Sequence, residues 1–230
     1  MSRKPFRRRV VLRRTAEDLV DGEIEDHIHH FAVRLGHRDG RVTAIDGRAV
    51  RAPWSLCPGA TAQLAELVGA PVGSPPASID PTAHCTHLLD LAVVALRFAA
   101  GGSATRRFSL DVTGWDQPEL TASARRDDGP ALRWTVRGGT ITDPEPYAGR
   151  HLGSGFTAWA TDALDDDEAE LALLLRRATW MSASRGIDLD QFDRLSQSAV
   201  PPGSCFASQP HRIDLARRNR GSSVPDLPEE

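Results

Sequence analysis

Residues 54–69 read WSLCPGATAQLAELVG and residues 80–100 read DPTAHCTHLLDLAVVALRFAA, and the expected fold is built around these two segments. In each segment a cysteine precedes an apolar run that is long enough to form a helix. Pro58 suits a first helical position and Gly69 suits a C-terminal stop, so the first segment predicts a helix over about 58–68 with Cys57 as its N-cap. Thr86 is expected to cap a second helix over 87–100, which leaves Cys85 beside its first turn.

Both cysteines are therefore expected at the beginning of a helix. Backbone N–H groups and the positive end of the helix dipole favour a thiolate over a thiol. The thiolate is the form that binds metal ions and attacks electrophiles. We therefore expect the chemistry of this protein to lie in residues 54–100.

Composition limits the class of protein. The chain has 230 residues, of which 40% are hydrophobic and 26% charged, as in an ordinary globular protein. The net charge of -3 argues against a nucleic-acid partner. No apolar run reaches the roughly 18 residues of a membrane span, and no secretory segment follows the basic start, so we expect a cytoplasmic protein without a membrane partner. Three cysteines do not make a disulfide framework and fit free thiols better.

The rest of the chain gives the expected fold class, α+β in a single domain over residues 1–230. We expect a small antiparallel sheet with helices headed by Cys57 and Cys85, extended by a β-meander and a long helix. Residues 1–102 would form the core with the Cys/His site, residues 103–160 a strand-rich elaboration, and residues 161–230 a helix and a cysteine-bearing tail. The strand-rich part could shape either a pocket or a homodimer interface, and the sequence leaves both open.

Several elements of this fold have local signals. Residues 1–9 are expected to be loose before a strand at 9–14, Asp21-Gly22 is expected to form a turn, and Asp39-Gly40 is a strong hairpin signal between strands at 28–35 and 41–50. A proline-rich joint occupies 69–76. Strands are predicted at 106–113, 119–126 and 131–137. The acidic run at 165–168 predicts the start of a helix that ends near 184.

The candidate metal ligands come from the histidines and the cysteines. Cys57, Cys85 and His87 would supply three ligands, and Cys205 or His29 would complete the tetrahedron that Zn²⁺ favours. Four protein ligands would make a closed structural site, whereas three ligands and a water would leave a position for catalysis. Strand alternation would place His27 and His29 on one face and His30 on the other.

Two other interpretations remain open at this point. In a metal-free enzyme, Cys85 or Cys57 would attack a carbonyl or thioester carbon while His87 moves the proton. Asp90, one helical turn below, would orient that imidazole. Alternatively, the thiols are small buried hydrophobic groups, as free cysteines commonly are.

The same residues carry a resemblance to a bacterial family, domain of unknown function 2889 (DUF2889). The matching features are His29 before a hairpin strand, Pro53 with Cys57 ahead of a helix, the segment 85–88 (Cys-Thr-His-Leu), and the late Cys205. The resemblance covers roughly residues 9–100 and, more loosely, the tail. It implies no settled reaction.

A second, weaker resemblance concerns residues 26–100 and the iron-sulfur scaffold fold of the IscU and NifU type. The turn 39–42 (Asp-Gly-Arg-Val), Cys57 and the pair His84-Cys85 occur in the order found in that fold. The earlier scaffold cysteine would fall near Asp26. The resemblance implies a hairpin followed by two helices, with ligands that converge at the helix N-termini.

The leading hypothesis is therefore a metal-binding enzyme that acts on a small organic substrate by hydrolytic or lyase chemistry. Its ion would be Zn²⁺ or, alternatively, iron, and no nucleotide cofactor is expected. The catalytic candidates are His87 and Cys85. The alternatives are the metal-free cysteine enzyme and a non-catalytic metal or iron-sulfur carrier.

Overall fold

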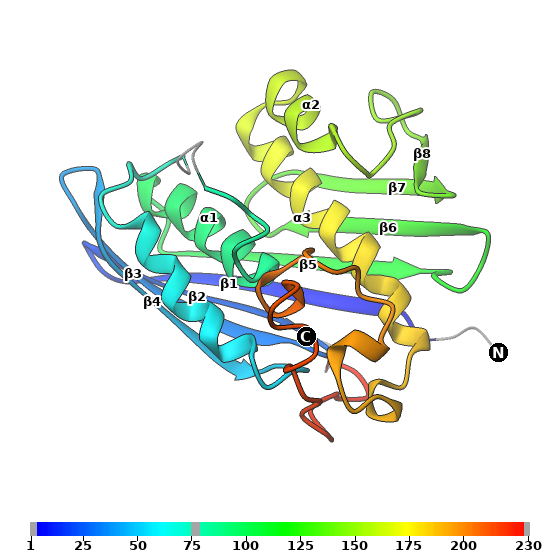
Figure 1. The fold of residues 1–230 in the computed structure, drawn as a ribbon. Helices are drawn as coiled ribbons and strands as arrows, with labels where there is room; N and C mark the ends of the chain where they lie inside the picture. Colours follow the sequence, from blue (N-terminus) through cyan, green and yellow to red (C-terminus); the bar gives the residue numbers. More distant parts are fainter. Residues whose placement is uncertain (1–3, 75–78, 228–230) are drawn as a thin grey trace. The chain divides into compact units, whose positions relative to one another are not determined.

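The computed structural model describes residues 4–74 and 79–227, so residues 75 and 76 of the proline-rich joint lie outside the described residues. The protein is of the α+β class (Figure 1). The chain divides into two compact units. The core unit comprises Val10–Arg106 and Leu189–Asp226. The inserted unit comprises Arg107–Asp188 with, among the described residues, Lys4–Arg9 and Leu227.

The core unit contains four strands in the order β4-β3-β2-β1. They are β1 (Phe6–Ala16), which begins in the inserted unit, β2 (Leu19–Asp26), β3 (His30–Arg38) and β4 (Arg41–Arg51). Strands β2 and β3 pair antiparallel, as do β3 and β4. The hairpin turn at Asp39-Gly40 is confirmed, because both residues have positive φ angles of 50° and 72°.

Two helices cover one face of this sheet. A 3-10 helix, η1 (Cys57–Leu67), packs on β4, and α1 (Thr86–Ala100) packs on β2 and β3 (Figure 1). Both helices bury apolar residues, including Leu64 and Leu67 of η1 and most of α1. The opposite face of β1–β4 carries exposed polar side chains.

The helix boundaries differ from the expected ones by one residue. Leu56, and not Cys57, is the N-cap of η1, so Cys57 is its first residue. Cys85, and not Thr86, is the N-cap of α1, and its carbonyl accepts the first intrahelical bond from Leu89 N. The side chain of Thr86 is thus not needed as a cap. Both cysteines nevertheless lie at helix starts.

Two further expectations about the first strands are wrong. Strand β1 begins at Phe6 because Phe6, Arg8, Val10 and Leu12 alternate into the buried side of the sheet. Asp21-Gly22 lies inside β2 and not in a turn. A Cβ on Gly22 would come within 2.9 Å of Leu12 Cδ2 and 3.3 Å of Leu91 Cδ1, so glycine here allows α1 to pack closely.

The inserted unit is a meander with two helices on it. Its strands β5 (Thr105–Thr113), β6 (Glu119–Arg126), β7 (Ala131–Arg137) and β8 (Thr140–Asp143) follow in sequence order, and the three predicted strands are confirmed. Helix α3 (Asp166–Ser182), capped by Asp165, packs on β6 and β7, as Figure 1 shows. The sequence did not predict α2 (Phe156–Ala163), which packs on α3.

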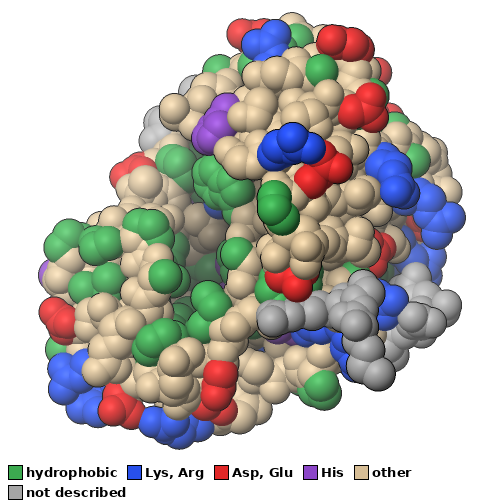
Figure 2. Space-filling view, turned by 90° about the vertical axis from the view of Figure 1, so that its right-hand side faces the viewer, with side chains coloured by type: hydrophobic (Ala, Val, Ile, Leu, Met, Phe, Trp, Pro, Cys, Tyr) green, Lys and Arg blue, Asp and Glu red, His purple; other side chains and the backbone are tan. Residues whose placement is uncertain are grey.

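The C-terminal tail returns to the core unit. Leu189–Asp226 contains only short helical turns, among them η5 (Phe206–Ser208), and joins the core through backbone hydrogen bonds. The sequence analysis grouped the long helix with the tail in residues 161–230. In the structure α3 lies in the inserted unit and the tail lies in the core unit. No described helix has the length and apolarity of a membrane span. Acidic and basic side chains are interspersed on the face drawn in Figure 2.

Candidate metal centre

The turn between β2 and β3 is built around the carboxylate of Asp26. Asp26 Oδ1 accepts hydrogen bonds from Ile28 N and His29 N, each 2.8 Å long, and Asp26 N donates to His29 O over 2.8 Å. An aspartate that binds backbone amides two and three residues later is a standard way to close a turn. His27 and His29 lie between β2 and β3, so the turn and not strand alternation sets their positions. It brings His29 to the start of β3, where its ring is buried.

His87 meets His29 from the helix layer. It is the second residue of α1, and its ring stacks on that of His29 with centroids 3.9 Å apart and planes inclined by 25°. Phe31 lies beside both rings, with centroid distances of 5.9 Å to His29 and 6.1 Å to His87. The two histidines come from residues 58 positions apart in the chain, and both are buried.

Asp26, His29 and His87 together bring one potential metal-ligand atom each into close proximity. One ligand atom from each lies within 4.8 Å of the others, and no other triple of histidine, cysteine or acidic residues among the described residues meets this condition. His29 Nδ1 lies 3.2 Å from Asp26 Oδ1 and 3.3 Å from Oδ2. Two ligands about 2.0–2.1 Å from a tetrahedral ion are separated by roughly 3.3 Å. The distances between His29 Nδ1 and the Asp26 oxygens are therefore compatible both with a hydrogen bond and with two ligands of one ion.

The Asp26 carboxylate has lone pairs left with which it could bind a cation. Asp26 is 1% exposed, and a buried charge is unfavourable unless it is paired or binds a cation. Its Oδ1 is occupied by the two amides of the turn, whereas a carboxylate offers about four lone-pair directions over two oxygens. Asp26 Oδ1 thus holds the turn, while Oδ2 lies 3.3 Å from His29 Nδ1, at a distance that a shared ion could also bridge.

The three cysteines lie at the same end of the core unit but outside this group. Cys57 begins η1, Cys85 caps α1, and Cys205 caps η5 in the tail. The tail approaches Cys85 because Phe206 N donates to His84 O over 2.9 Å. All three thiols are free, and they are near enough to interact electrostatically with one another.

Burial determines the protonation of the two inner thiols. Removal from water raises the pKa of Cys57 far above its ordinary value, and the neighbouring Cys85 raises it further. Burial likewise raises the pKa of Cys85 to about 12, although the N–H groups of Leu88 and His87 act in the opposite direction. The expected stabilisation of thiolates at the helix starts is therefore present for Cys85 and is outweighed by desolvation.

Three other histidines have different surroundings. His84 is buried, with Nε2 3.2 Å from Glu66 Oε2, and it points to the far part of η1. His27 lies in the turn, where its carbonyl accepts a bond from Val224 N of the tail. His151 belongs to the inserted unit, and its Nδ1 accepts from Gly153 N. None of these three joins the Asp26 group.

The sequence interpretation pointed to His29 and His87 but missed Asp26 as a member of this group. A signal was present, since an acidic residue three positions before a histidine at the end of a strand suits an aspartate-closed turn. The signal is weak because aspartate is common in turns. The proximity of residues 26–29 to residue 87 depends on how α1 packs on the sheet, which local patterns do not give.

Comparison with known proteins supports the family resemblance. Residues 12–100 match the model of a family described as a protein of unknown function (DUF2889), so the expected resemblance is confirmed over this segment. The matched segment lies within the core unit and contains Asp26, His29 and His87. Neither the search of curated proteins nor that of solved structures found a match. The resemblance to the iron-sulfur scaffold fold stays a prediction.

Proposed function

We propose that the core unit binds a divalent transition-metal ion through Asp26, His29 and His87 and uses it in hydrolytic or lyase chemistry on a small organic substrate. The observation that carries this proposal is the convergence of three buried ligand atoms within 4.8 Å of one another. Buried polar groups of this kind are costly unless hydrogen bonds or an ion satisfy them. A shared cation would satisfy all three.

The donor set favours zinc or iron. One carboxylate and two imidazoles are the protein ligands of several catalytic zinc sites and of non-haem iron(II) sites. Three protein ligands leave a coordination position for water or substrate. Zn²⁺ in such a site lowers the pKa of bound water to about 7, which provides a nucleophile or a base at neutral pH.

The chain's own residues would position that ion. The Asx turn fixes Asp26 and His29 relative to each other, since both are joined by hydrogen bonds within the turn. The ring of Phe31 restricts both imidazoles from one side. Ligands held in this way lose little freedom when the ion binds, which favours affinity.

The second candidate function is a metal or iron-sulfur carrier that uses Cys57, Cys85 and Cys205. It is favoured by the proximity of three free thiols at one end of the core unit. Soft thiolates are the preferred ligands of iron-sulfur clusters and of tightly held zinc. The metal-free cysteine enzyme is less favoured, because the raised pKa values of Cys57 and Cys85 leave little thiolate near neutral pH.

Elemental analysis of protein purified without a metal-affinity tag tests these functions. We expect about one equivalent of zinc or iron in the wild type and a loss of metal in His87→Ala and Asp26→Asn. Cys85→Ser should retain the metal. The control is His30→Gln, because His30 neighbours His29 in the chain but binds Glu23 over 3.0 Å and is not part of the group.

Other results would favour the second candidate function. Metal that survives in His87→Ala but disappears in Cys85→Ser would replace the first candidate with the thiolate carrier. Cobalt substitution gives a second readout, because thiolate ligands produce an intense charge-transfer band that carboxylate and imidazole ligands do not. We expect this band to be absent from the cobalt protein.

A further inference from the structure

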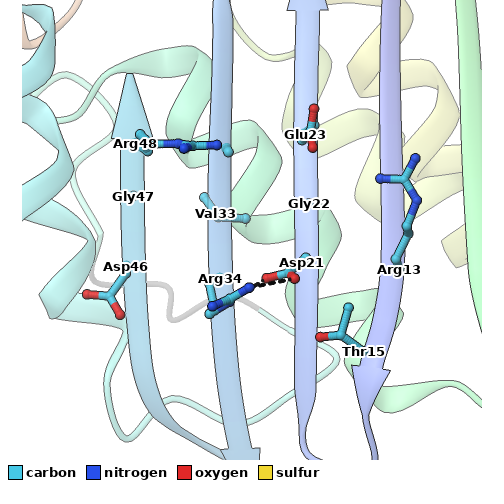
Figure 3. A pocket seen from close by; sticks show the side chains of 11 residues that line it. Arg13, Thr15, Asp21, Gly22, Glu23, Val33, Arg34, Asp46, Gly47 and Arg48 are labelled. Atoms are coloured by element: carbon cyan, nitrogen blue, oxygen red, sulfur yellow. Dashed lines mark hydrogen bonds and ion pairs between the residues drawn. The ribbon is translucent and has the colours of Figure 1, made fainter. Parts of the chain in front are cut away.

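The open face of the core sheet contains a hollow that the metal proposal does not use. It has a volume of about 460 Å³ and is lined by side chains and backbone of β1, β2, β3 and β4 (Figure 3). It lies on the face opposite η1 and α1, since Gly22 and Gly47 at its floor would direct a Cβ toward those helices. Volumes of about 300–1,000 Å³ are typical of small-molecule sites.

The strand register explains why the sheet is hollowed here. Glu23, Ala32 and Arg48 lie opposite one another across β2, β3 and β4, and Ala32 is the small residue between two long ones. The adjacent row contains Asp21, Arg34 and Asp46, in which a long arginine fills the middle position. The space is therefore above Ala32 and is bounded by Arg34.

Most of the carboxylates around the hollow already have partners. Asp21 accepts two hydrogen bonds from Arg34, of 2.7 and 3.0 Å, and this interaction holds the pKa of Asp21 below its usual value. Glu23 Oε2 lies 3.0 Å from His30 Nε2. Figure 3 shows the Asp46 carboxylate directed away from the other lining side chains.

Two guanidinium groups remain available. Arg13 of β1 and Arg48 of β4 line the hollow, and neither forms a hydrogen bond or a salt bridge within the described part of the chain. Arg13 interacts with Asp21 only at longer range. Figure 3 shows the Arg48 side chain extended across the sheet toward β3, with Arg13 on the other side of β2. The two strands are three strand spacings apart, about 14 Å, which leaves room for a small molecule between two long side chains.

We infer that this hollow binds a small organic dicarboxylate, with one carboxylate at Arg13 and the other at Arg48. Arginine presents a fixed fork of donors that matches a carboxylate with two parallel hydrogen bonds. Two such groups on opposite sides select a molecule with an anionic group at each end. The site is separate from the metal centre, so it does not depend on the proposed function.

Calorimetric titration of the full chain with succinate and glutarate tests the inference, with butyrate as the matched monocarboxylate. The titration is made at about 0.15 M salt, where long-range attraction between exposed charges is largely screened. We expect the dicarboxylates to bind at least about tenfold more tightly than butyrate, because their second carboxylate adds a second charge-assisted pair of hydrogen bonds. Equal affinities would overturn the inference and indicate non-specific attraction.

Variants locate the site and separate it from the metal centre. Arg13→Gln and Arg48→Gln should each reduce dicarboxylate affinity about tenfold or more and bring it near that of butyrate. Arg38→Gln is the control, because Arg38 is 74% exposed and does not line the hollow. Unchanged binding in both test variants would refute the site. Removal of metal with a chelator should leave dicarboxylate affinity unchanged, whereas a loss would place the anion at the metal centre instead.

Discussion

Two substitutions can separate the role of Asp26 in the turn from its proposed role as a metal ligand. Asp26→Asn keeps the Oδ1 acceptor for the amides of Ile28 and His29 but removes the charge. We expect it to fold while binding metal about 100-fold more weakly or worse, since loss of even an outer partner of a ligand costs 10–100-fold. Asp26→Ala should in addition lower the free energy of unfolding by about 2 kcal/mol, because it leaves buried amides unsatisfied. Urea unfolding and metal titration measure the two effects.

The outcome that would contradict this division is equal stability of the two variants. That result would mean that the turn forms without the carboxylate and that the geometry of Asp26 serves the ion alone. A variant Asp26→Asn with full metal affinity would instead remove Asp26 from the ligand set.

The cysteines should differ in reactivity because they differ in burial. Cys205 is partly exposed, whereas Cys57 and Cys85 are buried. We expect one thiol of the native protein to react rapidly with a disulfide reagent at pH 8, and all three after unfolding. Mass spectrometry of alkylated peptides should identify Cys205. Rapid modification of Cys57 in the native state would contradict the burial described above.

The Cys57 thiol also gives a pH dependence with a defined sign. Burial raises its pKa in the folded state, while the unfolded thiol ionises near its ordinary value of about 9. Above pH 9 the folded state therefore holds more protons than the unfolded state. The free energy of unfolding should fall as pH rises beyond that point, and Cys57→Ala should reduce this fall.

At the scale of the elements, glycine positions determine how closely the helices approach the sheet. Gly22→Ala would place a methyl group 2.9 Å from Leu12 Cδ2 and 3.2 Å from Val33 Cγ2. Because these side chains are packed under α1, we expect a loss of about 1–3 kcal/mol of stability in thermal or urea unfolding. Gly102→Ala is the control, as nothing lies within 4 Å of its added Cβ. A neutral Gly22→Ala would show that α1 can shift outward without cost.

Helix α1 depends on an arginine from β1 at its C-terminal end. Arg14 Nη2 donates to the carbonyls of Phe98, Ala99 and Gly101, over 3.2, 3.2 and 2.6 Å. Phe98 O also accepts from Gly101 N over 3.1 Å, but the last carbonyls of a helix lack their usual i+4 donors, and a cation there suits the helix dipole. We expect Arg14→Gln to destabilise the protein by about 1–2 kcal/mol, and Arg14→Lys by less because it keeps the charge. Equal effects of both changes would assign the stabilisation to hydrogen-bond geometry alone.

Local signals predicted many of the elements well. The Asp39-Gly40 hairpin, strands β5 to β7 and the acidic start of α3 have strong local chemistry, and the structure confirms them. The Asp21-Gly22 turn was wrong because the same dipeptide can serve close packing in a strand. The distinction depends on Leu91 of α1, about 70 residues later in the chain, and thus on tertiary structure.

At the scale of the whole molecule, the candidate centre depends on contacts between segments that sequence patterns treat separately. The residue types were informative, since the sequence alone points to both His29 and His87. The separation of the cysteines from the histidines was not predictable, because it depends on side-chain directions at the starts of η1 and α1. The tail was predicted as a loop, and its return to the core unit depends on individual hydrogen bonds such as that from Val224 N to His27 O.

The docking of this tail should control access to the candidate centre, and Arg218 is the residue that tests it. Its buried guanidinium donates to Pro53 O, Asp190 Oδ1 and the hydroxyls of Ser222 and Ser223. Arg218→Ala removes all four bonds, and we expect it to lower the free energy of unfolding by about 2 kcal/mol. This is less than the usual cost of breaking a fully buried ion pair, because Asp190 is 39% exposed. The tail should open while the sheet stays folded.

Hydrogen exchange and thiol modification measure that opening together. In Arg218→Ala, amides of residues 217–224 should exchange faster and Cys57 should become reactive, whereas the amides of β2 and β3 should stay protected. Arg194→Ala serves as the control, since Arg194 is an exposed residue of the same tail whose side chain donates to Asp214 O. Faster exchange throughout the core unit would mean that the tail is part of one cooperative fold, and that the centre is reached only by global unfolding.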